Sequence, residues 1–106
     1  MRSYARPVPD KAAMSVTAFL DDDAGYLAWT RAHPAGFVLN AHRNPGASYL
    51  KLHRATCHTV TGNPARGTVW TRAYSKHCSE DRLELVRWAR ERAGAEPDAC
   101  PLCEPT

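Results

Sequence analysis

The pattern of apolar and polar residues predicts two helices. Residues 21–34, "DDDAGYLAWTRAHP", begin with aspartates that suit a helix N-cap, continue with apolar residues at helical spacing and stop at a proline. Residues 79–94, "SEDRLELVRWARERAG", begin with a serine cap, carry acids in the first turn and arginines in the last, and end at a glycine. We therefore expect both segments to form short amphipathic helices.

Alternating and β-branched runs predict a sheet between these helices. Residues 36–43, "GFVLNAHR", and 48–55, "SYLKLHRA", are strand-like and flank "NPGA", which is a hairpin signal. Residues 68–75, "TVWTRAYS", alternate as a third strand after the turn-rich loop "TGNPARG". The pattern predicts an α+β fold: a small antiparallel sheet with two helices.

Length and composition fit one globular domain. The chain has 106 residues, of which 43% are hydrophobic and 24% charged. Residues 1–14 contain two prolines and show no periodicity, so we expect a loose N-terminal arm followed by a single domain over residues 15–106. A core of this size benefits from a staple such as a disulfide or a metal ion.

The four cysteines point to a metal rather than to disulfides. No run approaches the length of about 20 apolar residues that crosses a membrane, and "MRSYARPVPDKAAMSV" lacks the apolar centre of a secretory signal. We therefore expect a cytoplasmic protein, in which disulfides are disfavoured. A thioredoxin-like role for "CPLC" is disfavoured too, because that motif precedes a helix and only three residues follow Cys103.

A metal needs more ligands than Cys100 and Cys103 supply, because structural zinc takes four, usually Cys and His. The tightest upstream pair is in "HRATC", where His53 and Cys57 are four residues apart at the end of a predicted strand. Two such pairs converging on one ion would clamp the sheet to the tail.

The same residues carry a resemblance to a known family. The run "LHRATC", a strand, a helix ending "RWARERAG" and then "CPLCEP" resemble the metal-binding domain of the Ada DNA-repair protein and of relatives attached to nucleases, over residues 49–105. The resemblance implies a C-terminal zinc knuckle with Zn2+ held by His53, Cys57, Cys100 and Cys103. It does not extend to methyl transfer from DNA phosphate, because His53 stands where that repair protein has its methyl-accepting cysteine.

Cys78 is the alternative to His53 as the fourth ligand. An all-cysteine site would consist of Cys57, Cys78, Cys100 and Cys103. It would use every cysteine and would leave His53 an ordinary strand residue. Cys78 can also be a small buried apolar residue, or a reactive thiolate for which the sequence offers no catalytic partner.

Charge is distributed unevenly along the chain. Residues 36–78 contain six Arg or Lys and no Asp or Glu, whereas residues 79–106 contain four Arg and seven acids. Mixed charges would keep a sheet edge soluble equally well, so a sheet of one sign indicates a polyanionic partner. The expected nucleic-acid contacts are Arg43, Lys51, Arg54, Arg66, Arg72 and Lys76, with Trp70 available to stack on a base.

Together these features predict a zinc-stabilised module that binds nucleic acid, DNA in preference to RNA. We expect no catalysis, because no nucleophile, base and orienting acid can be named together. The alternative is a protein-interaction module of the same fold that meets an acidic partner.

Overall fold

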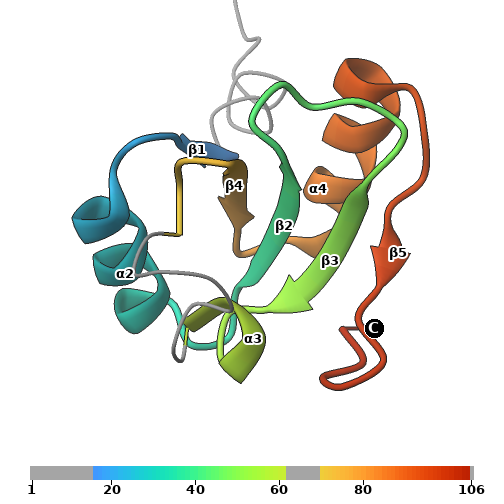
Figure 1. Cartoon of the computed structure of the whole chain (residues 1–106). Coiled ribbons are helices and arrows are strands. Elements are labelled where there is room, and N and C mark those ends of the chain that lie inside the picture. The colour runs from blue at the N-terminus through green and yellow to red at the C-terminus, as the bar shows by residue number, and fades with distance from the viewer. Residues whose placement is uncertain (1–15, 62–69, 106) are drawn as a thin grey trace, which may run out of the picture.

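A computed structural model describes residues 16–61 and 70–105 and shows one sheet with helices on both sides (Figure 1). Its strands are β1 (Thr17–Phe19), β2 (Phe37–His42), β3 (Leu50–Arg54), β4 (Tyr74–Ser79) and β5 (Asp98–Ala99). Its helices are α2 (Asp23–Ala32), the four-residue α3 (His58–Thr61) and α4 (Arg82–Trp88), which continues as a π-helical turn, η1 (Ala89–Ala93). The predicted α+β class is confirmed, and the predicted N-terminal arm lies outside the described residues.

The five strands have the order β1-β4-β2-β3-β5. The predicted hairpin is confirmed as β2 and β3, which pair antiparallel. Neither β1 nor β5 was predicted, and β5 pairs with β3 in parallel, so the sheet is mixed rather than wholly antiparallel. The chain reaches β5 only after passing along α4 and η1 (Figure 1), and this return path gives the last strand its parallel direction.

The third strand lies further along the chain than the sequence predicts. We expected it at residues 68–75, but β4 begins at Tyr74. The carboxylate of Asp23 accepts hydrogen bonds from the backbone N–H groups of Trp70 and Thr71, each at 2.8 Å. These bonds hold the backbone of Trp70 and Thr71 against the start of α2, outside the strand.

Both long helices begin at an aspartate. The carboxylate of Asp22 accepts a hydrogen bond from Gly25 N at 2.9 Å and caps α2, as the acid cluster predicted. The second helix begins later than expected, because Ser79 remains in β4 and Asp81 provides the cap through Leu83 N, also at 2.9 Å.

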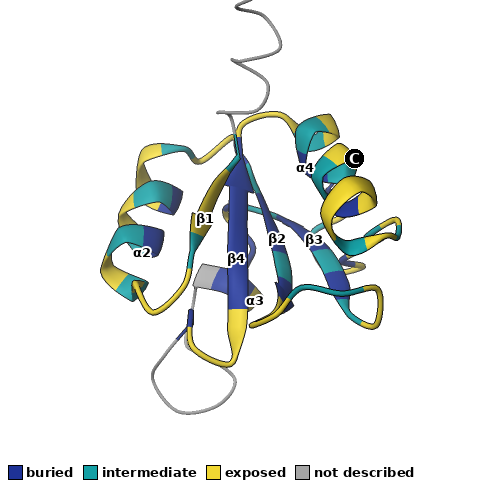
Figure 2. Ribbon diagram, turned by 90° about the horizontal axis from the view of Figure 1, so that it is seen from above, coloured by how far each residue is buried: buried dark blue, intermediate teal, exposed yellow. Residues whose placement is uncertain are grey.

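The sheet separates two apolar cores, with α2 on one face and α4 on the other (Figure 2). On the α2 face, Tyr26, Val38 and Cys78 are fully buried. On the α4 face, Leu39 and Leu85 are fully buried. Adjacent residues of β2 thus serve opposite cores, as the alternation of a strand requires.

Gly94 ends the helical segment with a φ of 77°, and its N–H donates to Ala89 O. A Cβ at Gly94 would meet no atom within 4 Å, so the cost of adding one lies in the backbone alone. We expect Gly94→Ala to lower the free energy of unfolding by about 1 kcal/mol in urea denaturation. Gly46 is equally open but has no left-handed φ, so Gly46→Ala should not destabilise. Equal losses in both variants would contradict this account.

Candidate metal centre

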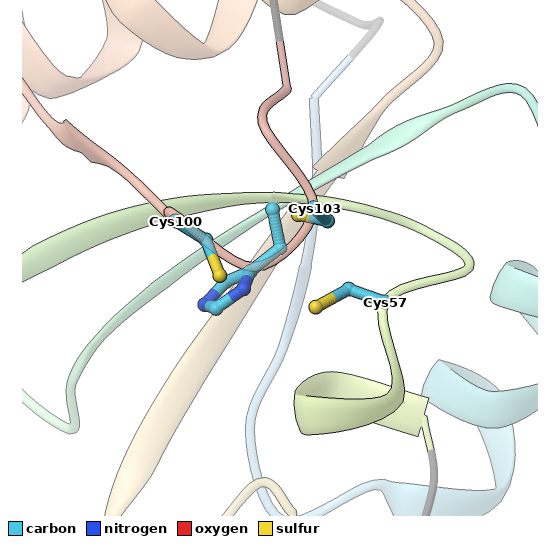
Figure 3. Close-up of side chains that lie close together, drawn as sticks. Cys57, Cys100 and Cys103 are labelled. Carbon is cyan, nitrogen blue, oxygen red and sulfur yellow. The ribbon is translucent and has the colours of Figure 1, made fainter.

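Four potential metal ligands gather where the tail meets the sheet. They are His53, Cys57, Cys100 and Cys103. One ligand atom from each lies within 4.8 Å of those of the others. Figure 3 shows the three cysteines approaching one another from the segment after β3 and from the tail. The predicted group of four residues therefore does come together in the structure.

Backbone hydrogen bonds of β3 position the cysteines. The N–H of Cys100 donates to Leu52 O at 2.9 Å, which sets Cys100 beside the residue that follows Leu52, His53. The N–H of Cys57 donates to Arg54 O at 3.0 Å and turns the chain back toward the strand. The N–H of Arg54 itself donates to Cys103 Sγ at 3.2 Å. Every ligand is thus placed relative to one short strand.

The side chain of Arg54 holds the tail as well. Its Nε donates to Cys103 O at 2.8 Å, and its Nη2 donates to Glu104 O at 2.9 Å. Sequence reasoning had placed Arg54 among the nucleic-acid contacts. In the structure its guanidinium instead satisfies carbonyls of the turn that carries Cys103.

The imidazole of His53 is arranged as a neutral ligand. Its side chain is 5% exposed, and its buried Nε2 has no hydrogen-bond partner among the residues the structure describes. Burial lowers the pKa of His53 to about 4, with the charges of Lys76 and Lys51 adding to the effect. A neutral imidazole with one unpartnered nitrogen is the form that binds a metal ion.

Thr59 supports this arrangement, although nothing in the sequence singled it out. Its Oγ1 lies 3.3 Å from His53 Nδ1 and 2.9 Å from Cys57 Sγ. A hydrogen on Nδ1 directed at Thr59 leaves the lone pair of Nε2 for a metal. A threonine at a short helix is too common for the sequence to mark it.

The thiols differ in how readily they ionise. Burial raises the pKa of Cys100, but hydrogen bonds from the backbone N–H groups of Cys103 and Leu102 outweigh it, so the pKa lies below the usual value. Burial raises the pKa of Cys103 to about 11, and the neighbouring sulfur of Cys57 adds to the rise. Three thiolates this close repel one another strongly unless a cation lies between them.

The donor set fits a tetrahedral metal centre. Three sulfurs and one imidazole nitrogen form one of the common structural zinc sets. With metal–sulfur bonds of about 2.3 Å, tetrahedral ligand atoms are roughly 3.3–3.8 Å apart. The observed limit of 4.8 Å requires only a small contraction of the group.

Cys78 does not belong to this group. It pairs with Val38 of β2, which pairs on its other side with His53, so the two residues are separated by two strand spacings, about 10 Å. Cys78 is fully buried, and burial raises the pKa of its thiol to about 12. Within the described ranges, the four gathered ligands match the His53 site and not the all-cysteine alternative.

Two of the expected nucleic-acid contacts are buried. Trp70 is 8% exposed and Lys76 is 3% exposed. Lys76 Nζ donates to Asn40 Oδ1 and to Trp70 O, both at 2.8 Å. We had expected Trp70 to offer a stacking surface from a strand face, and that expectation is wrong because β4 begins only after Trp70.

The remaining expected contacts differ in their exposure and in their partners. Arg43 is exposed and forms an ion pair with Asp21 at 2.8 Å. Arg72 is exposed in the loop before β4, and Lys51 is half-buried in β3. Arg66 lies outside the described residues. Among the described residues, the expected cations thus do not all belong to one exposed face of the sheet.

Comparison with family models, with curated proteins and with solved structures finds no match for this chain. The resemblance to the Ada-like domain therefore stays a prediction. None of the helices in residues 16–61 and 70–105 combines the length and the apolar composition needed to cross a membrane.

Substitution can distinguish His53 from Cys78 as a ligand. We expect His53→Ala to lose bound metal, because it removes a donor that no other group replaces. We expect Cys78→Ala to keep one ion per chain, because only a buried apolar contact changes. Native mass spectrometry measures the stoichiometry directly. Metal retained by His53→Ala and lost by Cys78→Ala would establish the all-cysteine site.

Thr59→Val should weaken metal binding by about 10- to 100-fold, because it removes the hydroxyl that orients His53 and contacts Cys57. Thr59→Ser keeps that hydroxyl and should bind the metal like the wild type. Competition with a chromophoric chelator gives both affinities. Equal affinities for Thr59→Val and Thr59→Ser would show that the hydroxyl is not needed.

Proposed function

We propose that this chain is a zinc-binding module in which the metal fixes the tail to the sheet. The observation that carries the proposal is that His53 and three cysteines bring one ligand atom each within 4.8 Å of one another. The buried Nε2 of His53 has no hydrogen-bond partner among the described residues. Binding of structural zinc contributes about 10–16 kcal/mol in small peptides near pH 7, which matches or exceeds the stability of an ordinary domain.

A structural role for the metal follows from the number of ligands. Four protein ligands complete a tetrahedron, whereas a catalytic zinc keeps one position open for water or substrate. His53, Cys57, Cys100 and Cys103 would hold the ion, which would neutralise most of the thiolate charge. The chain's contribution is to orient these four side chains before the ion binds.

We infer that the module binds nucleic acid, with DNA preferred. The inference is supported by the 43 residues from 36 to 78, which contain six cations and no acid. Of these cations, Lys76 is buried and Arg54 holds the tail, whereas Arg43 and Arg72 are exposed, Arg43 in an ion pair with Asp21. The proposed resemblance of the ligand motif to the metal-binding domain of a DNA-repair protein also supports DNA as the preferred ligand.

Zinc content and salt-dependent binding test this proposal. The purified chain should contain one zinc ion, and a strong chelator should lower its melting temperature. Fluorescence anisotropy with labelled DNA should show affinity that falls between about 50 and 200 mM salt, with a log–log slope of about −0.7 to −0.9 per phosphate contacted.

Zinc binding and nucleic-acid binding can be refuted independently of each other. Absence of stoichiometric zinc, with an unchanged melting curve under chelator, would exclude the metal role. Absence of binding to any DNA or RNA at low salt, together with binding to an acidic protein, would favour the protein-interaction alternative.

A further inference from the structure

Three aromatic rings pack together at the end of the sheet that lies away from the metal centre. They belong to His42, Tyr49 and Tyr74, which we call the aromatic triad. The ring centres are 5.4 Å apart for His42 and Tyr49, 5.6 Å for His42 and Tyr74, and 5.7 Å for Tyr49 and Tyr74. The rings of His42 and Tyr74 are nearly parallel, at 21°.

Strand pairing brings the triad together. His42 is the last residue of β2 and pairs with Tyr74, the first residue of β4. Both lie on the same sheet face as Val38, which pairs with His53. His42 is four residue steps along β2 from Val38, so the triad lies about 13 Å along the sheet from the metal centre.

The triad is open to solvent. His42 is exposed, and the side chain of Tyr74 is 39% exposed. Tyr74 is one of the few large hydrophobic residues that the described part of the chain leaves exposed. Rings that pack on one another while presenting an outer surface are available to a further planar group.

Two arginines lie close to members of the triad along the chain, one residue after His42 and two residues before Tyr74. Arg43 follows His42, and its Nη1 donates to Arg72 O at 3.0 Å, which brings the two residues to the same edge. The guanidinium of Arg72 forms no hydrogen bond or ion pair with a described residue. The pair of Arg43 with Asp21 is exposed on both sides, and the guanidinium donates to both carboxylate oxygens, at 3.0 and 2.8 Å. A phosphate can take the place of the carboxylate in the same two-pronged geometry, so Arg43 binds it by exchanging one anion for another.

A cation also approaches the triad from the core. Lys76 Nζ lies 5.6 Å from the centre of the Tyr74 ring. The triad itself contains no aliphatic side chain, and each of its members carries a polar atom. This composition suits nucleobases, which stack on aromatic faces and offer polar edges, better than it suits lipid chains.

We propose that the aromatic triad, with Arg43 and Arg72, binds single-stranded nucleic acid. Unpaired bases stack on Tyr74 and His42, and the adjoining phosphates meet the two guanidiniums. Duplex is a poorer ligand for this surface, because its base faces are already stacked. The proposal rests on the proposed function. It specifies where on the protein the nucleic acid binds and that the nucleic acid is single-stranded.

Anisotropy with the zinc-loaded full chain tests the assignment. The probes are a labelled oligothymidine of about 12 nucleotides and a blunt duplex of equal length. We expect the single strand to bind more tightly. His42→Ala and Tyr74→Ala should each reduce that affinity by about 10-fold or more, whereas Tyr74→Phe, which keeps the ring, should bind nearly as well as wild type.

Leu83→Ala is the matched control, because Leu83 is 61% exposed on α4, away from the triad. It should leave the affinity unchanged. Zinc content and melting temperature are measured for each variant. If Tyr74→Ala does not fold, Arg72→Gln and His42→Ala decide the question, since both residues are exposed.

The outcomes separate this assignment from the proposed function. If His42→Ala, Tyr74→Ala and Arg72→Gln all bind the single strand with wild-type affinity, the triad is not the binding site, although the chain still binds nucleic acid. Duplex preferred over single strand, or equal losses in Tyr74→Phe and Tyr74→Ala, would overturn it as well. A wild-type chain that binds no nucleic acid at all would overturn both.

Discussion

The pairing of β5 with β3 is the interaction on which the arrangement depends. It is two residues long, too short to hold a strand in a sheet by itself, and it must close the 42 residues that separate Cys57 from Cys100. The guanidinium of Arg54 adds two hydrogen bonds to the tail, and the proposed zinc adds two thiolate bonds. The tail is therefore held by hydrogen bonds, by the proposed metal coordination and by apolar contact, since Cys100 belongs to the core on the α2 face and the side chain of Pro105 is fully buried.

A metal centre of this composition also accounts for part of the acid-free segment. Three thiolates, one neutral imidazole and a divalent ion leave one net negative charge. Lys51 and Lys76 are close enough to affect the pKa of His53, so their field stabilises that negative charge. A carboxylate on the same strands would repel the thiolates and compete for the ion. The proposed phosphate binding would be one reason for the absence of acids, and the proposed metal centre would be a second.

The sequence predicted the ligands better than it predicted the sheet. Metal donors come from few residue types at short spacings, so His53, Cys57 and the final Cys-x-x-Cys could be paired by inspection. The strand after the loop could not be placed, because Asp23, nearly fifty residues earlier in the chain, decides where it begins. Its hydrogen bonds hold the backbone of Trp70 and Thr71 at the start of α2, and the side chain of Trp70 packs beside Tyr26 in the core. No local sequence pattern records contacts of this range. The aromatic triad could not be predicted for a similar reason, because the contact between His42 and Tyr74 depends on the register in which β2 pairs with β4.

The two ends of the α2 face are built differently. His42 and Tyr74 are fixed by the six-residue pairing of β2 with β4, which does not involve the tail. The metal ligands depend on β3, α3 and the tail, and β3 is the neighbour of β2 on the opposite side from β4. The proposed metal can therefore stabilise the domain without being part of the proposed binding surface. Lys76 lies in β4 between these ends, and its hydrogen bond to Asn40 links β4 to β2 through the core. The ammonium group of Lys76 is buried and donates to Asn40 Oδ1 and Trp70 O. It therefore stabilises the fold and is not itself available to contact a phosphate.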